Sequence, residues 1–361
     1  MKKVLFVTAA LVATACSSGG NPDPMPSPST SASAPVGWPV RSAEYFDLWL
    51  HGYAMIMNDT AKVPLFDRGY RDRMMERRRA ANVTTALDAN MQALRDGLSK
   101  SPGVEGGQFA IFNFASLDEL ARVSRQFIQG EGSPQTVNDP TTQQLFLTLR
   151  NYFRTVADRE WLRLFVESIQ DENAKFYQSY WNAQQSDRAA TRTAVSNAWN
   201  NTYKAKFQRY LRNERLVDGT FILSLPIGGE GRTMIDPNQG NAVAAAFPEA
   251  SADQMASLYV FAHEITGKAA ERAIEDNLTP AQAREGGAAK LIPIGAVRGG
   301  AILLQRIAPE LLQGYQRFYL RQVGASVPTG DPNAAFIAAF DLPQGVADGL
   351  ARQIDLVLAG I

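Results

Sequence analysis

The clearest strand pattern in the chain is Gly219-Thr-Phe-Ile-Leu-Ser-Leu-Pro-Ile-Gly-Gly-Glu-Gly-Arg-Thr-Met-Ile235. Apolar and β-branched residues flank a glycine-rich turn, which predicts one or two strands. A candidate partner strand follows at Ala242–Phe247. Ser251-Ala-Asp-Gln254 then has the pattern of a capping box and predicts a helix that runs to about Asp276.

Outside this region the sequence reads mostly as helix. Apolar residues recur at helical spacing from Ser42 to Met57, Ser116 opens a second capping box, and Asp139-Pro140 has the preferred order for a helix start. The remaining ranges expected to be helical are 67–99, 141–213 with breaks near Arg154–Asp158 and Ser186, a short helix capped by Thr279-Pro280, 297–323 and 343–360. Gln108–Phe114 is expected to be a strand. The fold class predicted is α+β, predominantly α-helical, with a small sheet in one large domain.

Composition excludes several classes of function. The 361 residues hold 36 basic and 36 acidic side chains, two histidines and one cysteine. One cysteine is too few for an internal disulfide or a thiolate zinc site. The balanced charge gives no electrostatic reason to expect nucleic-acid binding. Apolar residues make up 45%, enough for a hydrophobic core.

The amino terminus has the layout of a secretory signal. Two lysines precede an apolar run, and Ala13-Thr14-Ala15-Cys16 follows. This tetrapeptide resembles the lipobox of bacterial lipoproteins, although Leu11 lies further from the cysteine than in the usual pattern. The resemblance implies a signal peptide at 1–15, cleavage after Ala15 and a lipid on Cys16. An ordinary cleaved signal with an incidental cysteine is the alternative.

The segment after Cys16 is rich in proline, serine and glycine, so residues 16–40 are expected to form a disordered tether. The globular domain is expected at 41–361. Ser17 and Ser18 take the place where aspartate would signal inner-membrane retention, so the resemblance implies an extracytoplasmic protein, in the outer membrane if the organism has one. Leu291–Leu304 is apolar but short, and is expected to be a buried helix rather than a membrane span.

The helix expected after Ser251 carries the sharpest candidate for chemistry, His263-Glu264-Ile-Thr-Gly267. A strand, a short connection and a helix with His-Glu resemble zincin-type metallopeptidases, over about residues 219–276. In that family His-Glu-x-x-His places two histidines on one helix face to bind zinc, and the glutamate activates the bound water. The resemblance implies His263 as a metal ligand and Glu264 as the general base.

Gly267 stands where the second histidine belongs, which removes one zinc ligand. Glu271, expected on the same helix face, and the distant His51 are the remaining candidate ligands. The competing interpretation is a packed, hydrogen-bonded histidine at the edge of an apolar helix face. A glycine inside a helix costs about 1 kcal/mol relative to alanine, which either a close helix crossing or space for a ligand would justify.

Two further features have a functional and a structural interpretation. Pro226–Arg232 either presents backbone N–H groups to an anion beside Arg232 or is a tight hairpin. His51 follows Trp49 and Leu50, so it either lines an aromatic cavity or is simply packed. Six arginines between Arg68 and Arg79, interleaved with acids, are expected to form a solvated face, with anionic lipid as the rival partner.

Two functions therefore compete. The first is a non-catalytic binding or scaffold role at the cell envelope, with a peptide, a glycan or an envelope protein as partner and no cofactor. The second is a zinc-dependent, peptidase-like hydrolase that uses His263 and Glu264. In both cases the membrane is a partner through the lipid anchor.

Overall fold

The computed structural model describes residues 37–235, 240–279, 281 and 287–361. The signal peptide, Cys16, most of the tether and the helix expected after Thr279-Pro280 fall largely outside these residues. The globular domain starts before residue 41, because Trp38 is 2% exposed and packs edge-on against Phe261.

A four-stranded sheet lies at the centre of the domain, in the order β1-β2-β4-β3. Its strands are Val40–Arg41 (β1), Gly219–Ser224 (β2), Arg232–Met234 (β3) and Asn241–Ala246 (β4). β1, β2 and β4 are parallel, and β3 pairs antiparallel with β4 at the edge. The predicted pairing of the segment after residue 242 is therefore confirmed.

The expected hairpin at 226–232 is wrong, because β2 and β3 are not neighbours. The loop between them is held by a different segment of the chain. Gly228 N–H donates to Leu65 O at 2.6 Å, Glu230 N–H donates to Pro64 O at 3.0 Å, and Asp67 N–H donates to Pro226 O at 2.9 Å. These long-range backbone bonds replace the local pairing of a hairpin.

Helices form most of the rest, which confirms the predicted fold class. The first group comprises α1 (Glu44–Ile56), α2 (Tyr70–Ala80), α3 (Ala86–Lys100), α4 (Pro102–Gly106), α5 (Leu117–Gln129), α6 (Pro140–Tyr152), α7 (Val156–Glu172), α8 (Gln178–Asp187), α9 (Ala189–Ala198) and α10 (Lys204–Asn213). The second comprises α11 (Met255–Ile265), α12 (Gly267–Asn277), α14 (Gly287–Ile307), α15 (Leu312–Gln322), α16 (Asn333–Ala339) and α17 (Gln344–Ala359). Asn173–Tyr177 and Trp199–Tyr203 are π-helical turns that continue α7 into α8 and α9 into α10.

Capping residues and helix breaks in the sequence predicted most helix ends correctly. The Ser116 hydroxyl accepts from Glu119 N–H at 3.1 Å, and the Asp139 carboxylate accepts from Thr142 N–H at 2.8 Å. The expected breaks fall between α6 and α7 and at Arg188. The strand expected at Gln108–Phe114 is instead a 3-10 helix, Gly107–Asn113, because its buried residues recur every three positions.

The helix expected from Ser251 to Asp276 is broken. A 3-10 turn at Ser251–Asp253 precedes α11, and α11 and α12 are separated at Thr266. The Thr266 hydroxyl lies 3.1 Å from Ala262 O, 2.9 Å from His263 O and 3.2 Å from Ala296 O. A hydroxyl that competes for the carbonyls of the preceding turn bends or ends a helix.

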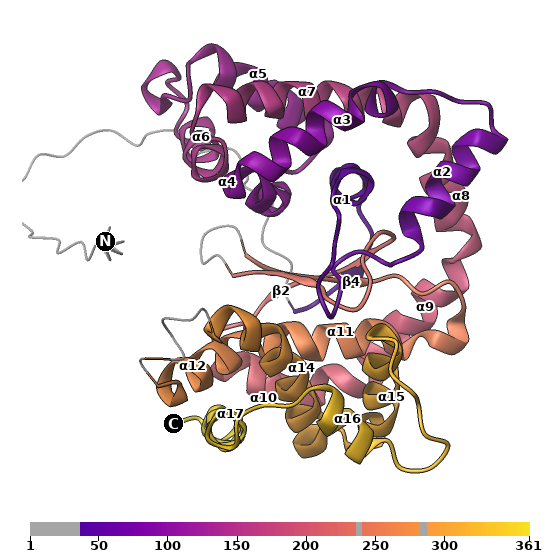
Figure 1. Ribbon diagram of the computed structural model, residues 1–361, viewed down its shortest axis with the longest axis vertical. Coiled ribbons are helices and arrows are strands. Elements are labelled where there is room, and N and C mark those ends of the chain that lie inside the picture. The colour runs from indigo at the N-terminus through magenta and orange to yellow at the C-terminus, as the bar shows by residue number, and fades with distance from the viewer. Residues whose placement is uncertain (1–36, 236–239, 280, 282–286) are drawn as a thin grey trace, which may run out of the picture. The chain divides into compact units, whose positions relative to one another are not determined.

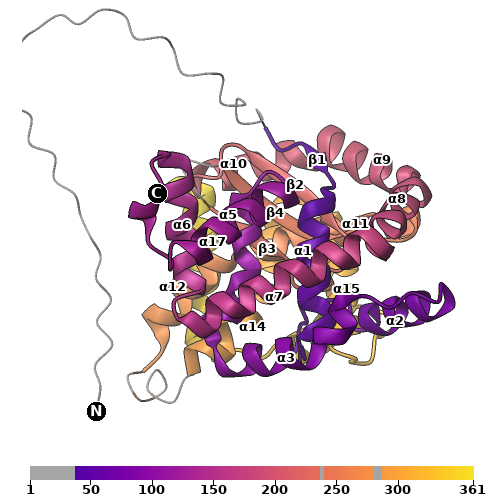
Figure 2. The same cartoon turned by 90° about the horizontal axis from the view of Figure 1, so that it is seen from above.

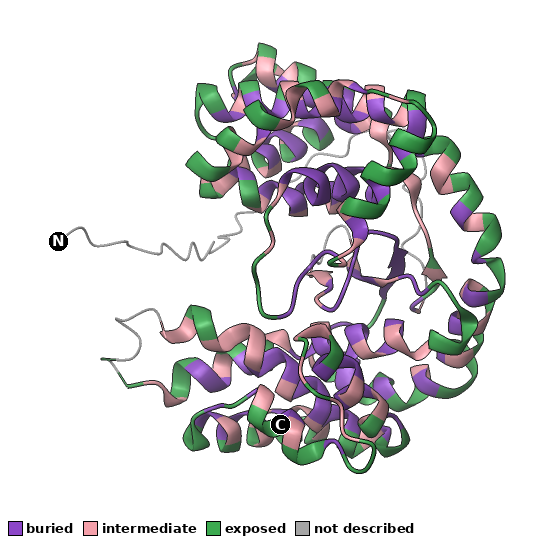
Figure 3. Ribbon diagram, turned by 45° about the vertical axis from the view of Figure 1, so that its right-hand side comes forward, coloured by how far each residue is buried: buried purple, intermediate pink, exposed green. Residues whose placement is uncertain are grey.

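Helices cover both faces of the sheet. α1, α3 and α7 lie on one side, and α11, α12 and α14 lie on the other (Figure 1). Figure 2 shows β1 at the edge of the sheet beside β2. α1 is buried along nearly its whole length, from Phe46 to Ile56, so its apolar sequence forms part of the core (Figure 3).

α14 is the one described helix that is long and apolar enough to cross a membrane, judged by length and composition alone. It packs against α11, α12 and α17. Core helices of globular domains have the same length and composition, so this observation is weak evidence for a span.

Candidate functional site

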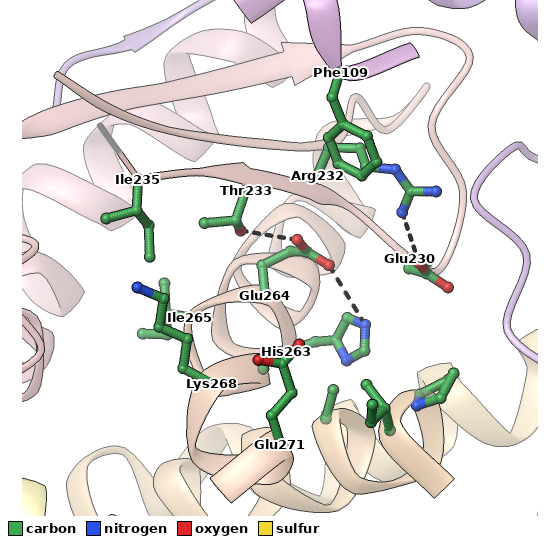
Figure 4. Close-up of a pocket in the computed structure, with 14 residues that line it drawn as sticks. Phe109, Glu230, Arg232, Thr233, Ile235, His263, Glu264, Ile265, Lys268 and Glu271 are labelled. Atoms are coloured by element: carbon green, nitrogen blue, oxygen red, sulfur yellow. Dashed lines mark hydrogen bonds and ion pairs between the residues drawn. The ribbon is translucent and has the colours of Figure 1, made fainter. Parts of the chain in front are cut away.

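A pocket of about 460 Å³ opens between β3, the α11–α12 junction and α14. We call it the Glu264 pocket (Figure 4). It brings together most of the predicted site residues: Arg232, His263, Glu264, Gly267 and Glu271. His51 is not among the residues that line it, and Cys16 lies outside the described residues.

Glu264 joins the helix α11 to the edge strand. Its Oε1 accepts from the backbone N–H of Gly231 at 3.1 Å, and its Oε2 accepts from the Thr233 hydroxyl at 2.8 Å. Its side chain is 11% exposed. Both carboxylate oxygens are therefore directed at β3 rather than at open space.

Burial raises the pKa of the Glu264 carboxyl above its usual value. The nearby charge of Glu230 acts in the same direction, while His263, Arg232 and the Thr233 hydrogen bond oppose it. A carboxyl with a raised pKa inside a pocket is a common property of functional sites, although ion-pair networks in the core share it.

His263 precedes Glu264 and is 2% exposed, deeper than the half-buried position expected. Its Nε2 lies 3.5 Å from Glu264 Oε1, and its ring packs against Tyr319 at 5.5 Å between centroids. Within the described part of the chain, Nδ1 has no hydrogen-bond partner.

Glu271 lines the same pocket as His263 but lies on a separate helix. The break at Thr266 puts Glu271 on α12, where it is exposed. Among residues 37–235, 240–279, 281 and 287–361, no three His, Cys, Asp or Glu side chains are grouped so that they would hold a metal ion. His51 does not line this pocket, so the three candidate ligands do not form one site in the described structure.

Arg232 forms a second charged group in the pocket. It pairs with Glu230 at 2.6 Å, and its guanidinium lies 3.3 Å from Gln108 Oε1 and 5.1 Å from the centre of the Phe109 ring. Sequence reasoning missed the roles of Gln108 and Phe109 because it assigned them to a strand. A 3-10 helix next to β3 brings them to Arg232 instead.

Gly267 begins α12 and faces open space. A Cβ added there would meet nothing within 4 Å, so a close helix crossing does not explain the glycine. Lys268 and Glu271 are exposed on the same helix, and among the described residues neither forms an ion pair. Ile235, Ile265, Ile292 and Pro293 supply the apolar part of the wall.

His51 belongs to a separate, fully buried network. Its Nε2 lies 3.1 Å from Glu172 Oε1 and its Nδ1 lies 3.0 Å from the Tyr70 hydroxyl. Glu172 Oε2 accepts from Arg78 at 3.0 Å. Arg78 is 3% exposed, so the expected solvated face on α2 is wrong at this position. Arg78 faces inward because it neutralises the buried Glu172.

His51 and Glu172 differ in charge: His51 is neutral and Glu172 is ionised. Burial lowers the pKa of His51, against the opposing effect of Glu172. Burial would raise the pKa of Glu172, but its hydrogen bond to His51 and the charge of Arg78 outweigh burial and hold that pKa below its usual value. Neutral His51 then donates from Nε2 to ionised Glu172 and accepts from Tyr70 at Nδ1.

Asp47 is a further buried carboxyl that sequence reasoning did not identify. It accepts from Trp181 Nε1 at 3.0 Å and from Leu225 N–H at 3.3 Å, and so ties α1 to α8 and to the end of β2. Burial raises the pKa of Asp47 to about 7, although its hydrogen bonds oppose the shift. The only signal in the sequence was one acidic residue inside an otherwise apolar helix.

Comparison with known proteins adds no assignment: no family model, no curated protein and no solved structure matches the chain.

Proposed function

We propose that the chain is a membrane-anchored envelope lipoprotein whose domain binds an extended peptide in the Glu264 pocket without chemical turnover. One observation carries the binding function. Charged groups of both signs converge with apolar side chains in a pocket of about 460 Å³ beside the edge strand of the sheet. Ligand pockets in proteins span roughly 300–1,000 Å³, so the size is suitable.

The edge strand favours a peptide over other ligands. β3 pairs only with β4, and no other backbone hydrogen bond to residues 232–234 occurs within the described chain. An extended peptide can pair with such an edge, while pockets beside it hold side chains or a charged terminus. Lys268 suits a carboxylate and Glu271 suits an ammonium group, whereas Arg232 and Glu230 pair with each other.

Two features favour binding without catalysis. Hydrogen bonds from Gly231 N–H to Oε1 and from the Thr233 hydroxyl to Oε2 fix the Glu264 carboxylate against the edge of the sheet. The position of the second zinc-binding histidine is Gly267. A fixed carboxylate at this place instead holds the edge strand in position for a ligand.

A metal-dependent hydrolase is the second candidate. His263 and Glu264 lie together in the pocket, and Nδ1 of His263 lacks a partner among the described residues. Zinc would require further ligands from water or substrate. Metal analysis of the purified protein discriminates the two candidates: stoichiometric zinc favours the hydrolase, and its absence after purification without chelators favours binding alone.

The anchor is tested independently of the pocket. Replacing Cys16 with serine removes the only sulfur that could carry the lipid thioether. We expect the wild-type chain to incorporate labelled palmitate in a bacterial host and the Cys16→Ser chain to incorporate none. Equal labelling of both chains would reject lipidation at this residue.

Peptide binding is tested by selection followed by blocking of the pocket. Peptides selected from a random ten-residue display library on the wild-type protein are titrated against Gly267→Trp and Gly330→Trp. A Cβ at either glycine meets nothing within 4 Å, so both variants tolerate the start of a side chain, but only Gly267 lines the pocket. We expect at least tenfold weaker binding to Gly267→Trp and unchanged binding to Gly330→Trp. Equal affinity for both variants, or no selectable peptide, would refute the proposal.

A further inference from the structure

A second pocket, of about 310 Å³, lies where the chain enters the domain. We call it the Gly37 pocket. Its walls include Gly37, Trp38, Lys204, Arg212 and Val217. It shares no lining residue with the Glu264 pocket.

The start of the described chain is fixed against this pocket. Gly37 N–H donates to the Asp218 carboxylate at 2.7 Å, and Gly219 N–H donates to Gly37 O at 2.9 Å. Trp38 Nε1 donates to Leu216 O at 3.2 Å. Gly37 lies beside the start of α10, because a Cβ added at Gly37 would lie 3.2 Å from Lys204 Nζ.

α10 and the turn after it carry an excess of positive charge. Between residues 204 and 215 the sequence holds Lys204, Lys206, Arg209, Arg212 and Arg215 but one acidic residue, Glu214. Glu214 is neutralised by Arg272, and Lys206 by Glu310. The other four cations form no ion pair with any residue that the structure describes.

Two of these cations flank the pocket. Lys204 and Arg212 are eight residues apart, which places them on one face of the helix about two turns from each other. Val217 beside them is 60% exposed, whereas Trp38 and Leu211 are buried at 2% and 3%. The surface thus combines an apolar floor, an exposed apolar side chain and unpaired cations, with one carboxylate, Asp218, which accepts from Gly37 N–H.

We propose that the Gly37 pocket and the cationic face of α10 contact the membrane and bind the phosphodiester headgroups of anionic phospholipids. Cations supply the charge complement to phosphate, and Val217 reaches the boundary between headgroups and acyl chains. The proposal rests in part on the lipid anchor at Cys16. A tether of 20 residues, 17–36, separates Cys16 from Gly37, and a flexible chain of that length has a root-mean-square span of about 25 Å.

The attachment of the tether at Gly37 favours one face of the domain for contact with the bilayer. Electrostatic attraction to a charged membrane decays over about 8 Å at physiological ionic strength. An anchor joined to the domain at Gly37 keeps the adjoining α10 face nearer to the bilayer than the far side of the domain, so this face enters that range first. The Glu264 pocket, on other elements, stays available for its ligand.

The test uses a fluorescent reporter at Val217. Because Cys16 is the only native cysteine and would be acylated, Val217→Cys gives a single thiol for an environment-sensitive dye. Leu147→Cys on α6, 44% exposed in the wild-type chain, is the control position. Each labelled full-length protein is reconstituted into phosphatidylcholine vesicles with or without 30% phosphatidylglycerol, with a nitroxide-headgroup lipid as quencher.

We expect the Val217 dye to be quenched at least threefold more with phosphatidylglycerol than without it, and the difference to vanish in 0.5 M salt. Lys204→Glu with Arg212→Glu should abolish the difference, whereas Arg122→Glu with Arg125→Glu on α5, an equal change of charge, should preserve it. Equal quenching on both vesicles, or an α10 variant that behaves like wild type, overturns the proposal.

Flotation of the same samples separates this proposal from the anchor. If the protein does not float with phosphatidylcholine vesicles but its Val217 dye is quenched on added phosphatidylglycerol vesicles, lipidation fails and the headgroup surface stands. If it floats and the Val217 dye is no better quenched than the Leu147 dye, the anchor stands and the surface is rejected.

Discussion

Thr233 on the edge strand donates a hydrogen bond of 2.8 Å to the carboxylate of Glu264 on the helix that follows the sheet. The second oxygen of the same carboxylate accepts from the backbone of Gly231, immediately before that strand. One side chain therefore sets the position of β3 relative to α11. The resemblance to zincins implies that Glu264 is a general base. In this structure Glu264 holds the edge strand in place beside the pocket.

Removing the Thr233 hydroxyl tests this role. In Thr233→Val the side chain keeps its size but leaves Glu264 Oε2 without its partner, so we expect the free energy of unfolding to fall by about 1–2 kcal/mol. Urea denaturation measures the change. The matched control is Thr193→Val, since that exposed hydroxyl bonds only to Ala189 O in its own helix and its loss should cost less than about 0.5 kcal/mol. Equal costs for the two variants would show that the bond to Glu264 has no special part in stability.

The buried contacts of Glu172 with His51 and Arg78 should be important for the stability of the fold. Glu172→Ala would leave buried Arg78 with Asp88 as its one remaining ion-pair partner in the described structure and His51 without its acceptor, so we expect a loss of about 3–5 kcal/mol in stability. Glu160→Ala on the same helix breaks an exposed pair with Arg163 and should cost less than about 1 kcal/mol. Chemical denaturation of both variants checks the contrast. A small loss for Glu172→Ala would mean that His51 and Arg78 are not held as described.

Because the pKa of Asp47 is raised, we expect the stability of the protein to depend on pH. Its pKa in the folded protein is about 7, above the ordinary value of 3.8. Between these values the folded state retains a proton that the unfolded state releases, so the contribution of Asp47 to stability is lost as pH rises through about 4 to 7, by up to about 1.4 kcal/mol per pH unit.

Asp47→Asn removes this titration. We expect the difference in unfolding free energy between variant and wild type to move in favour of the variant by about 1–3 kcal/mol from pH 4.5 to pH 7.5. Urea titrations across that range, with Asp253→Asn at an exposed position as the control, make the measurement. Parallel pH profiles for wild type and Asp47→Asn would contradict a raised pKa.

Replacement of Gly267 and of Gly231 by alanine should have opposite effects on the stability of the protein. At Gly267 the added Cβ meets open space in the first turn of a helix, so we expect Gly267→Ala to stabilise the protein by up to about 1 kcal/mol. At Gly231 the Cβ would lie 2.5 Å from Ala244 O, so Gly231→Ala should destabilise. Thermal unfolding of the two variants measures both changes in stability. Destabilisation at Gly267 would show that its backbone or surroundings need glycine after all.

The sequence predicted those features of the fold that depend on residues close together in the chain. The caps at Ser116 and Asp139, the breaks near Arg154 and Ser186, and the pairing of the 242–247 segment with the sheet all follow from local patterns. Arg232 and the His263-Glu264 pair were predicted as two separate candidate sites, and the structure brings them into one pocket.

The errors arose where distant contacts decide the structure. The loop at 226–230 pairs with 64–67 rather than forming a hairpin, and no local signal in either segment indicates the other. The break at Thr266 depends on a carbonyl of α14, at Ala296. Likewise, Arg78 belongs to an arginine-rich exposed helix by sequence and is buried only because Glu172, 94 residues away, lies opposite.

The most direct test of binding without turnover is the mass of a bound peptide. A peptide selected on the wild-type protein is incubated overnight with an equimolar amount of protein and zinc, then analysed by mass spectrometry. We expect one species of unchanged mass, with wild type and Glu264→Gln alike. Two fragments whose masses sum to the peptide plus one water, formed by wild type and absent with Glu264→Gln, would establish hydrolysis and contradict the account.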